Sequence, residues 1–264
     1  MIPLIRPETL FEIHGSIAMF TFNRPAARNA LTWAMYEGLL EACQRVDEDP
    51  AVRVFVLRGA GDHAFAAGTD ILQFSEFQGG EDGLRYEARI DSVLERLARV
   101  VVPTVARVQG VAAGGGCAIA LTCDLRVCST NAIFGVPIAR TLGNCLSAAS
   151  CARIVALLGT ALLKDILFTG RMIGAEEAKA VGLTSRLVFP EELDAAVEEV
   201  AVAIAGNAPL TIKASKEILR RLEQGTRPET DLDADQISLC YGSEDFREGI
   251  AAFREKRRAR WKGI

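Results

Sequence analysis

The sequence has no uncharged apolar run of about 18 residues, the length that a membrane-spanning helix requires. Nor does it open with basic residues followed by apolar ones. It therefore predicts neither a membrane span nor a secretory signal. The formal net charge of −4 gives no electrostatic case for nucleic acid as the main partner. Six of the nine residues from 254 to 262 are basic, which fits either a solvated helical face or an anion site.

Residues that bind metals are also scarce. The only histidines are His14 and His63, and the seven cysteines include no C-x-x-C pair. This set argues against a zinc site, and we expect no metal. His63 is interpreted as an exposed loop residue. An odd number of cysteines fits free thiols in a reducing compartment, so we expect a cytoplasmic protein whose cysteines are mostly small core residues.

Strands and helices alternate in the first half of the chain, and helices dominate the last third. Short apolar runs bounded by turn residues predict strands, whereas apolar residues at helical spacing predict helices. The predicted strands are Thr9–Ile13, Ser16–Phe22, Val52–Leu57, Thr104–Val108, Leu125–Cys128, Ala132–Phe134 and Ser185–Val188. The predicted helices are Thr32–Asp47, Asp82–Arg99, Leu146–Leu158, Ala161–Phe168, Ala175–Val181, Pro190–Ala205, Pro209–Glu223 and Glu229–Arg260. This order predicts an α/β core with short sheets, followed by a helical C-terminal portion.

Two glycine-containing segments follow predicted strands. The first reads F-A-A-G-T-D-I from Phe65 to Ile71. Its small residues allow the backbone to approach a ligand, and a turn at Gly68 can leave the Thr69 N–H free to donate. The alternative is a plain loop between a strand and a helix.

The second segment is the run Gly114-Gly115-Gly116, which lies between a strand and an apolar helix. It matches neither a Walker A loop nor G-x-G-x-x-G. At a helix N-terminus the unpaired N–H groups and the macrodipole favour negative charge. The alternative is that three glycines simply permit close packing of strand and helix.

Together, in this order and spacing, the segments resemble the crotonase (enoyl-CoA hydratase/isomerase) superfamily over nearly the whole chain. The matching pieces are Asn23-Arg24-Pro25, Arg28–Leu31, Phe65–Ile71, Gly110–Cys117, Cys123-Asp124-Leu125, Phe134-Gly135, Thr169-Gly170, Ala175–Leu183, and Ser243–Phe246 through Lys256-Arg257. The resemblance implies a spiral of strand-strand-helix (ββα) turns in residues 1–200 and a C-terminal helical trimerisation region in residues 201–264. It also implies a homotrimer or a dimer of trimers.

The resemblance further implies an acyl-CoA substrate, with coenzyme A as part of the substrate and no separate cofactor. Matched residue by residue, the thioester oxygen would accept from the backbone N–H groups of Thr69 and Gly115. Substrate-binding positions also carry over from the pantetheine, adenine and 3′-phosphate contacts of the family. These positions are Arg24, Ala26, Ala67, Asp70, Ile71, Phe253 and Lys256.

The sequence departs from the hydratase pattern at both glutamates that position and activate water. The corresponding residues are Ala118 and Ile138, which cannot transfer a proton. Arg140 is a candidate contact for a carboxylate at the acyl end of the substrate, or it pairs with a distant acid. Cys145 is either a nucleophile or a small thiol near a helix start. Weak or absent crotonyl-CoA hydration is therefore expected.

Three classes of function stay open from the sequence. The first is an enzyme that acts on an acyl-CoA through an enolate, including a decarboxylase or hydrolase of a CoA thioester. The second is a non-catalytic acyl-CoA-binding protein, and the third is a structural oligomer. Whether another stretch, such as residues 73–83 with Glu76, Glu81 and Asp82, brings an acid into the pocket also stays open.

Overall fold

A six-stranded sheet forms the centre of the molecule. The computed structural model describes residues 7–223 and 233–264. Strands β1 and β2 form an antiparallel hairpin, and the remaining pairs of the sheet are parallel. The order is β1 (Thr9–His14), β2 (Ile17–Phe22), β3 (Val54–Gly59), β5 (Thr104–Val108), β7 (Leu125–Ser129) and β10 (Arg186–Val188). All these strands were predicted to within a few residues.

A second sheet of short strands lies beside the first. Its order is β4 (Ala64–Ala66), β6 (Val111–Ala113), β8 (Ile133–Gly135) and β9 (Ile173–Gly174). Successive turns of the chain therefore add one strand to each sheet before the next helix: β3 with β4, β5 with β6, and β7 with β8. This is the spiral of ββα turns that the sequence predicts.

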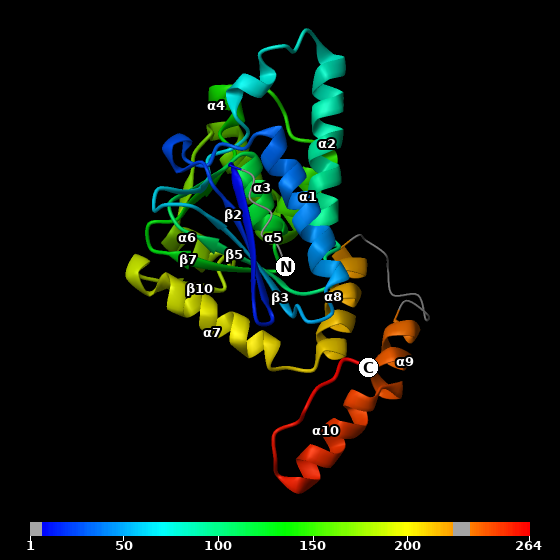
Figure 1. The fold of residues 1–264 in the computed structure, drawn as a ribbon. Coiled ribbons are helices and arrows are strands. Elements are labelled where there is room, and N and C mark those ends of the chain that lie inside the picture. Colours follow the sequence, from blue (N-terminus) through cyan, green and yellow to red (C-terminus); the bar gives the residue numbers. More distant parts are fainter. Residues whose placement is uncertain (1–6, 224–232) are drawn as a thin grey trace.

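Helices cover both faces of the six-stranded sheet, which explains why β3 is almost continuously apolar. Val54 and Val56 face α7 (Leu193–Ala205), whereas Phe55 and Leu57 belong to the larger core on the opposite face. That core also contains side chains of several helices, among them α1 (Trp33–Glu48), α2 (Gly80–Ala98) and α3 (Gly115–Thr122). Figure 1 shows where these helices lie relative to the sheet.

Local signals explain where several helices begin and break. As expected, Thr32 caps α1 by accepting from the Met35 N–H. The two helices predicted around Gly159 form one element, α5, with a break at that glycine, whose φ is 73°. The remaining helices of this part of the chain are α4 (Ile138–Thr141), α5 (Ala148–Thr169), α6 (Ala175–Ala180) and α8 (Pro209–Glu223).

The C-terminal helical stretch is divided, which corrects the single helix predicted over Glu229–Arg260. Residues 229–232 of that prediction lie outside the described residues. Helix α9 (Ala234–Gly242) ends at Ser243, which caps α10 (Glu244–Glu255) by accepting from the Phe246 N–H. Lys256 then adopts a left-handed φ of 51° and ends the helix.

The tail after α10 folds back along that helix. Buried Asp245 accepts hydrogen bonds from the N–H groups of Lys262 and Gly263, at 2.7 and 2.9 Å. The unit of α9, α10 and tail projects from the α/β body (Figure 1). The division into a core (1–200) and a helical region (201–264) stays a prediction, and α7 runs across residues 200 and 201.

No single helix of the described residues is long and apolar enough to cross a membrane. One pair of helices, Pro190–Ala205 with Pro209–Glu223, taken together has the length and composition of a membrane span, but the two helices are bent by 104°.

Candidate active site at the Gly68 and Gly114 turns

The two glycine turns lie against each other. Gly68 has a φ of 106° and Gly114 a φ of 50°, conformations that residues with a Cβ rarely adopt. A Cβ on Gly68 would lie 3.3 Å from the Ala113 carbonyl oxygen, and one on Gly114 would lie 3.6 Å from the Gly68 Cα. Glycine is therefore required at both turns by conformation and by the closeness of the two backbones.

The Thr69 N–H lies just after the first turn. The Leu31 N–H donates to the Gly68 carbonyl at 2.8 Å, and the Asp70 N–H donates to the Leu31 carbonyl at 2.9 Å. Thr69 lies between these two hydrogen bonds of the parallel bridge, so its own N–H is directed away from the partner strand. No acceptor for the Thr69 N–H lies within the described part of the chain.

The Gly115 N–H lies just after the second turn. Gly115 is the first residue of α3, and Gly114, anchored by its N–H to the Gly135 carbonyl at 2.9 Å, is the cap. The first N–H groups of a helix have no partner within it, and the described residues supply none for Gly115. Gly116 has another role, because a Cβ there would lie 2.1 Å from the Ala66 carbonyl oxygen. Gly116 thus fits the interpretation of close packing, whereas the interpretation of Gly115 as part of an anion site stays a prediction.

The side chains of two tyrosines surround these amides. A Cβ on Gly115 would lie 2.5 Å from the Tyr36 hydroxyl and 3.2 Å from Thr69 Oγ1. Thr69 Oγ1 lies 2.8 Å from the Tyr36 hydroxyl and 2.7 Å from that of Tyr86. Thr69 and Gly115, predicted from distant segments, are therefore neighbours.

Both tyrosines remain protonated at neutral pH. Burial raises the pKa of Tyr36 far above its usual value, and burial raises the pKa of Tyr86 to about 12. Sequence reasoning missed both residues. Trp33 lies 5.7 Å, between ring centroids, from each of them and so completes an aromatic wall. The only sequence signal for either tyrosine was the position of Tyr36, which lies one turn after the Thr32 cap on the buried side of α1.

Three predicted substrate contacts meet along the first turn. Arg24 Nη1 donates to Asp70 Oδ2 at 2.8 Å and to the Ala30 carbonyl at 2.6 Å. The Ala67 N–H donates to the Arg28 carbonyl at 3.1 Å, which joins this strip to the Arg24 segment. The hydrogen bond from Arg24 is the main cause that lowers the pKa of Asp70.

Two other predicted contacts lie on the surface beside this strip. Ala26 is exposed in the short 3-10 turn Pro25–Ala27, and Ile71 is 65% exposed at the start of the 3-10 turn Ile71–Phe74. An apolar side chain exposed to this degree is free to contact a ligand.

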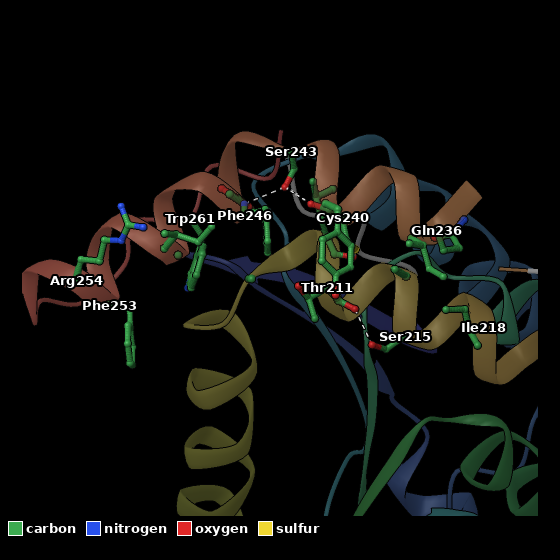
Figure 2. Close-up of a pocket in the computed structure, with 18 residues that line it drawn as sticks. Thr211, Ser215, Ile218, Gln236, Cys240, Ser243, Phe246, Phe253, Arg254 and Trp261 are labelled. Carbon is green, nitrogen blue, oxygen red and sulfur yellow. Dashed lines mark hydrogen bonds between the residues drawn. The ribbon is translucent and has the colours of Figure 1, made fainter. Parts of the chain in front are cut away.

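Phe253 and Lys256 do not join the other residues within this chain. Both lie at the end of α10, which projects away from the body (Figure 1), and Phe253 is 86% exposed. Phe253 borders a groove of about 700 Å³ between α8 and the unit of α9, α10 and tail. Figure 2 shows Thr211, Ser215 and Ile218 of α8 on one side of this groove and Cys240, Phe246 and Trp261 on the other.

Comparisons with known proteins agree with this architecture. The family model described as enoyl-CoA hydratase/isomerase matches residues 12–264.

The chain belongs to the enoyl-CoA hydratase/isomerase family.

Several relatives resemble this family member over nearly their full length. It is 34% identical to a short-chain-enoyl-CoA hydratase of Clostridium acetobutylicum, with 94% of this chain and 95% of the relative covered. It is 33% identical to a crotonyl-CoA hydratase of Syntrophomonas wolfei, with 95% and 96% covered. A crystal structure of an enoyl-CoA hydratase/carnithine racemase from Magnetospirillum magneticum matches with a TM-score of 0.93 and 33% identity, covering 99% and 97% of the two chains.

In this enoyl-CoA hydratase/isomerase family member, Ala118 is buried in α3 and Ile138 is partly buried at the start of α4. Arg140 is exposed on α4 and packs beside Gly170, where an added Cβ would lie 3.0 Å from the Arg140 Cβ. Cys145 is exposed before α5. No described contact joins Arg140 or Cys145 to the two turns.

Of the acids within residues 73–83, Glu76 and Glu81 are exposed. Asp82 accepts from the N–H groups of Gln78 and Gly79 and pairs with Arg85. No described contact joins these three acids to the two turns. A carboxylate one turn later, Glu87, is partly buried, and burial raises its pKa.

Metal binding has no evident location in this family member. Across residues 7–223 and 233–264, no group of three or more His, Cys, Asp or Glu side chains is arranged to hold a metal ion.

Proposed function

We propose that this family member binds an acyl-CoA thioester and stabilises its enolate with the backbone N–H groups of Thr69 and Gly115. The observation that carries the proposal is the pair of amides without acceptors on two glycine turns that touch. Enolate formation places negative charge on the thioester oxygen, and preorganised donors bind this oxygen more strongly as the charge develops. The N-terminus of α3 adds the favourable end of its dipole.

The coenzyme A portion would lie along the strip that contains Arg24, Ala67 and Asp70, with Ala26 and Ile71 at its exposed edge. Arg24 offers a guanidinium for a phosphate, a geometry that suits bidentate binding. No further cofactor is required by this chemistry. Phe253 and Lys256 lie at the end of α10, which projects from the body that carries this strip, so their contact with the 3′-phosphate requires a neighbouring subunit.

We infer a homotrimer or a dimer of trimers, and the groove between α8 and the α9–α10 unit supports this assembly. It is lined mainly by apolar side chains, and Tyr241 and Phe253 beside it are 66% and 86% exposed. Exposed apolar surfaces of this kind mark interaction sites. Light scattering coupled to size-exclusion chromatography will measure the mass, and a monomer at micromolar concentration would contradict the assembly.

Hydration of crotonyl-CoA is proposed to be weak or absent, because the family resemblance matches Ala118 and Ile138 to the positions at which hydratases position and activate water. Two measurements test the proposed function. Calorimetry with acetyl-CoA is expected to show saturable binding, and a spectrophotometric assay is expected to show little crotonyl-CoA hydration. Absence of binding would refute the proposal, whereas binding without turnover of any acyl-CoA would favour a non-catalytic binding protein.

Decarboxylation of a malonyl-type thioester is a second candidate reaction. The favouring observation is Arg140, an exposed guanidinium that has no side-chain hydrogen bond or ion pair with any described residue. Loss of carbon dioxide leaves an enolate, which needs the oxyanion donors and little from a protein base. Malonyl-CoA turnover that disappears in Arg140→Ala but persists in Arg186→Ala, an exposed arginine distant in sequence, would support this reaction.

A further inference from the structure

Helix α2 holds one carboxylate, Glu87, close to the two glycine turns. The preceding residue, Tyr86, places its hydroxyl 2.7 Å from Thr69 Oγ1. Helix α2 also packs against α3, the helix that begins with Gly115. Glu87 therefore lies on the helix that contacts Thr69 through Tyr86 and packs against α3.

One hydrogen bond holds Glu87 at the start of α5, because its Oε2 accepts from the Ser147 N–H at 3.1 Å. Burial, and to a lesser degree the charge of Glu87, raises the pKa of both Tyr36 and Tyr86. Glu87 thus contacts the start of α5 and acts electrostatically on the tyrosines whose hydroxyls contact Thr69.

Its neighbour Asp91, one turn further along α2, has a different set of contacts. Asp91 Oδ1 accepts from the hydroxyls of Ser147 and Ser150 at 2.7 and 3.1 Å, and these two hydrogen bonds hold it at the start of α5. Glu87 has only the single backbone donor at Ser147 among its described partners, which leaves oxygen lone pairs available. Both carboxylates accept a hydrogen bond from Ser147, but only the charge of Glu87 contributes to the raised pKa values of the two tyrosines.

Other side chains near the turns cannot move a proton at neutral pH. Ala118 and Ile138 have no titratable group. Asp70 is paired with Arg24, and both hydroxyls beside Thr69 have pKa values raised by burial. By contrast, burial raises the pKa of Glu87 above its usual value and makes its carboxylate a stronger base.

We propose that Glu87 is the acid–base group that removes a proton from the α-carbon of the bound acyl chain and returns it. This inference rests on the proposed function, because it uses the oxyanion donors. In the forward step the α C–H bond breaks and its proton bonds to a carboxylate oxygen of Glu87. The electron pair forms the carbon–carbon double bond of the enolate, and the carbonyl electrons move to the thioester oxygen. The reverse step restores the C–H bond and the carboxylate.

The test is exchange of the α-protons of butyryl-CoA in deuterium oxide, followed by NMR, with calorimetric affinity measured for each variant. Glu87→Gln keeps a side-chain oxygen that accepts from the Ser147 N–H, so the start of α5 retains its contact. Asp91→Asn is the matched control on the same helix. Exchange is expected to fall by about 100-fold or more in Glu87→Gln with unchanged affinity, and to persist in Asp91→Asn.

Each alternative outcome is distinct. Exchange at the wild-type rate in Glu87→Gln overturns the inference and leaves the proposed function intact. Loss of α-proton exchange in Tyr86→Phe, but not in Glu87→Gln, would assign the proton step to Tyr86. An equal loss in Glu87→Gln and Asp91→Asn overturns it in favour of a structural role at α5. Binding without exchange in the wild type also overturns it. Absence of butyryl-CoA binding in the wild type refutes the proposed function itself.

Discussion

Adding one methyl group at Gly115 tests the packing of the site most sharply. The Cβ of Gly115→Ala would lie 2.5 Å from the Tyr36 hydroxyl, 3.2 Å from Thr69 Oγ1 and 3.6 Å from Leu31 Cδ1. Gly115 is helical, with no positive φ, so the perturbation is steric. The hydroxyl of Tyr36 cannot easily withdraw, because its ring is buried against Trp33 and the oxygen is bonded to Thr69.

The Gly115→Ala change should affect both the free energy of unfolding and the rate of α-proton exchange. Overpacking of a rigid, buried site lowers the free energy of unfolding by about 1–3 kcal/mol. Displacement of Thr69 or of the first turn of α3 also misplaces a donor of the proposed oxyanion site. Loss of one such donor raises the barrier by about 3–4 kcal/mol, so the rate of α-proton exchange should fall by about 100- to 1,000-fold.

The assay compares the wild type with four variants by chemical denaturation and by butyryl-CoA exchange. Gly83→Ala on α2 is the control, since nothing lies within 4 Å of its added Cβ and alanine favours a helix by about 0.5–1 kcal/mol. Tyr36→Phe removes the atom that Gly115→Ala would meet at 2.5 Å. The double variant is therefore expected to be more stable than the sum of the single changes predicts.

Two results would refute the reasoning. One is a Gly115→Ala protein with wild-type stability and wild-type exchange. The other is strict additivity with Tyr36→Phe, which would mean that the alanine methyl group and the tyrosine hydroxyl do not meet.

Three further predictions concern the coenzyme A strip and the C-terminal tail. Arg24→Ala should weaken acetyl-CoA binding in calorimetry, whereas Arg186→Ala, which removes the same charge elsewhere, should leave it unchanged. The hydrogen bond from Arg24 lowers the pKa of Asp70, so the contribution of Asp70 to stability is complete above about pH 4 and is lost as the pH falls through the lowered pKa. Asp70→Asn should therefore flatten the dependence of the unfolding free energy on pH in that acid range. An unchanged slope would contradict the pairing of Asp70 with Arg24. Asp245→Asn replaces a buried charged acceptor of two tail N–H groups and should lower stability by about 1–3 kcal/mol, with faster hydrogen exchange confined to residues 257–264.

The strands of the six-stranded sheet could be predicted because each is a short apolar run with a clear boundary. The β4, β6 and β9 strands were missed, since they contain two or three residues and their partners are distant in the sequence. The break at Ser243 was also missed. A serine that caps α10 and a left-handed Lys256 end helices by local geometry that the helical composition of this region conceals.

The backbone part of the site was predictable and the side-chain part was not. Glycine at 68 and 114 identifies turns, because only positive φ and close approach require that residue. Thr69 and Gly115 were indeed found side by side. Tyr86 carries no sequence signal of its role, and the position of Tyr36 one turn after the Thr32 cap is a weak one, because an aromatic residue on a buried helical face is usually core. Glu87 resembles any charged residue of α2 until the packing against α5 is known.

A crystal structure with a non-reactive acyl-CoA analogue tests the central proposal most directly. The thioester oxygen is predicted to lie within about 2.7–3.1 Å of both the Thr69 and the Gly115 backbone nitrogens. A bound analogue whose thioester oxygen contacts neither nitrogen would contradict the account.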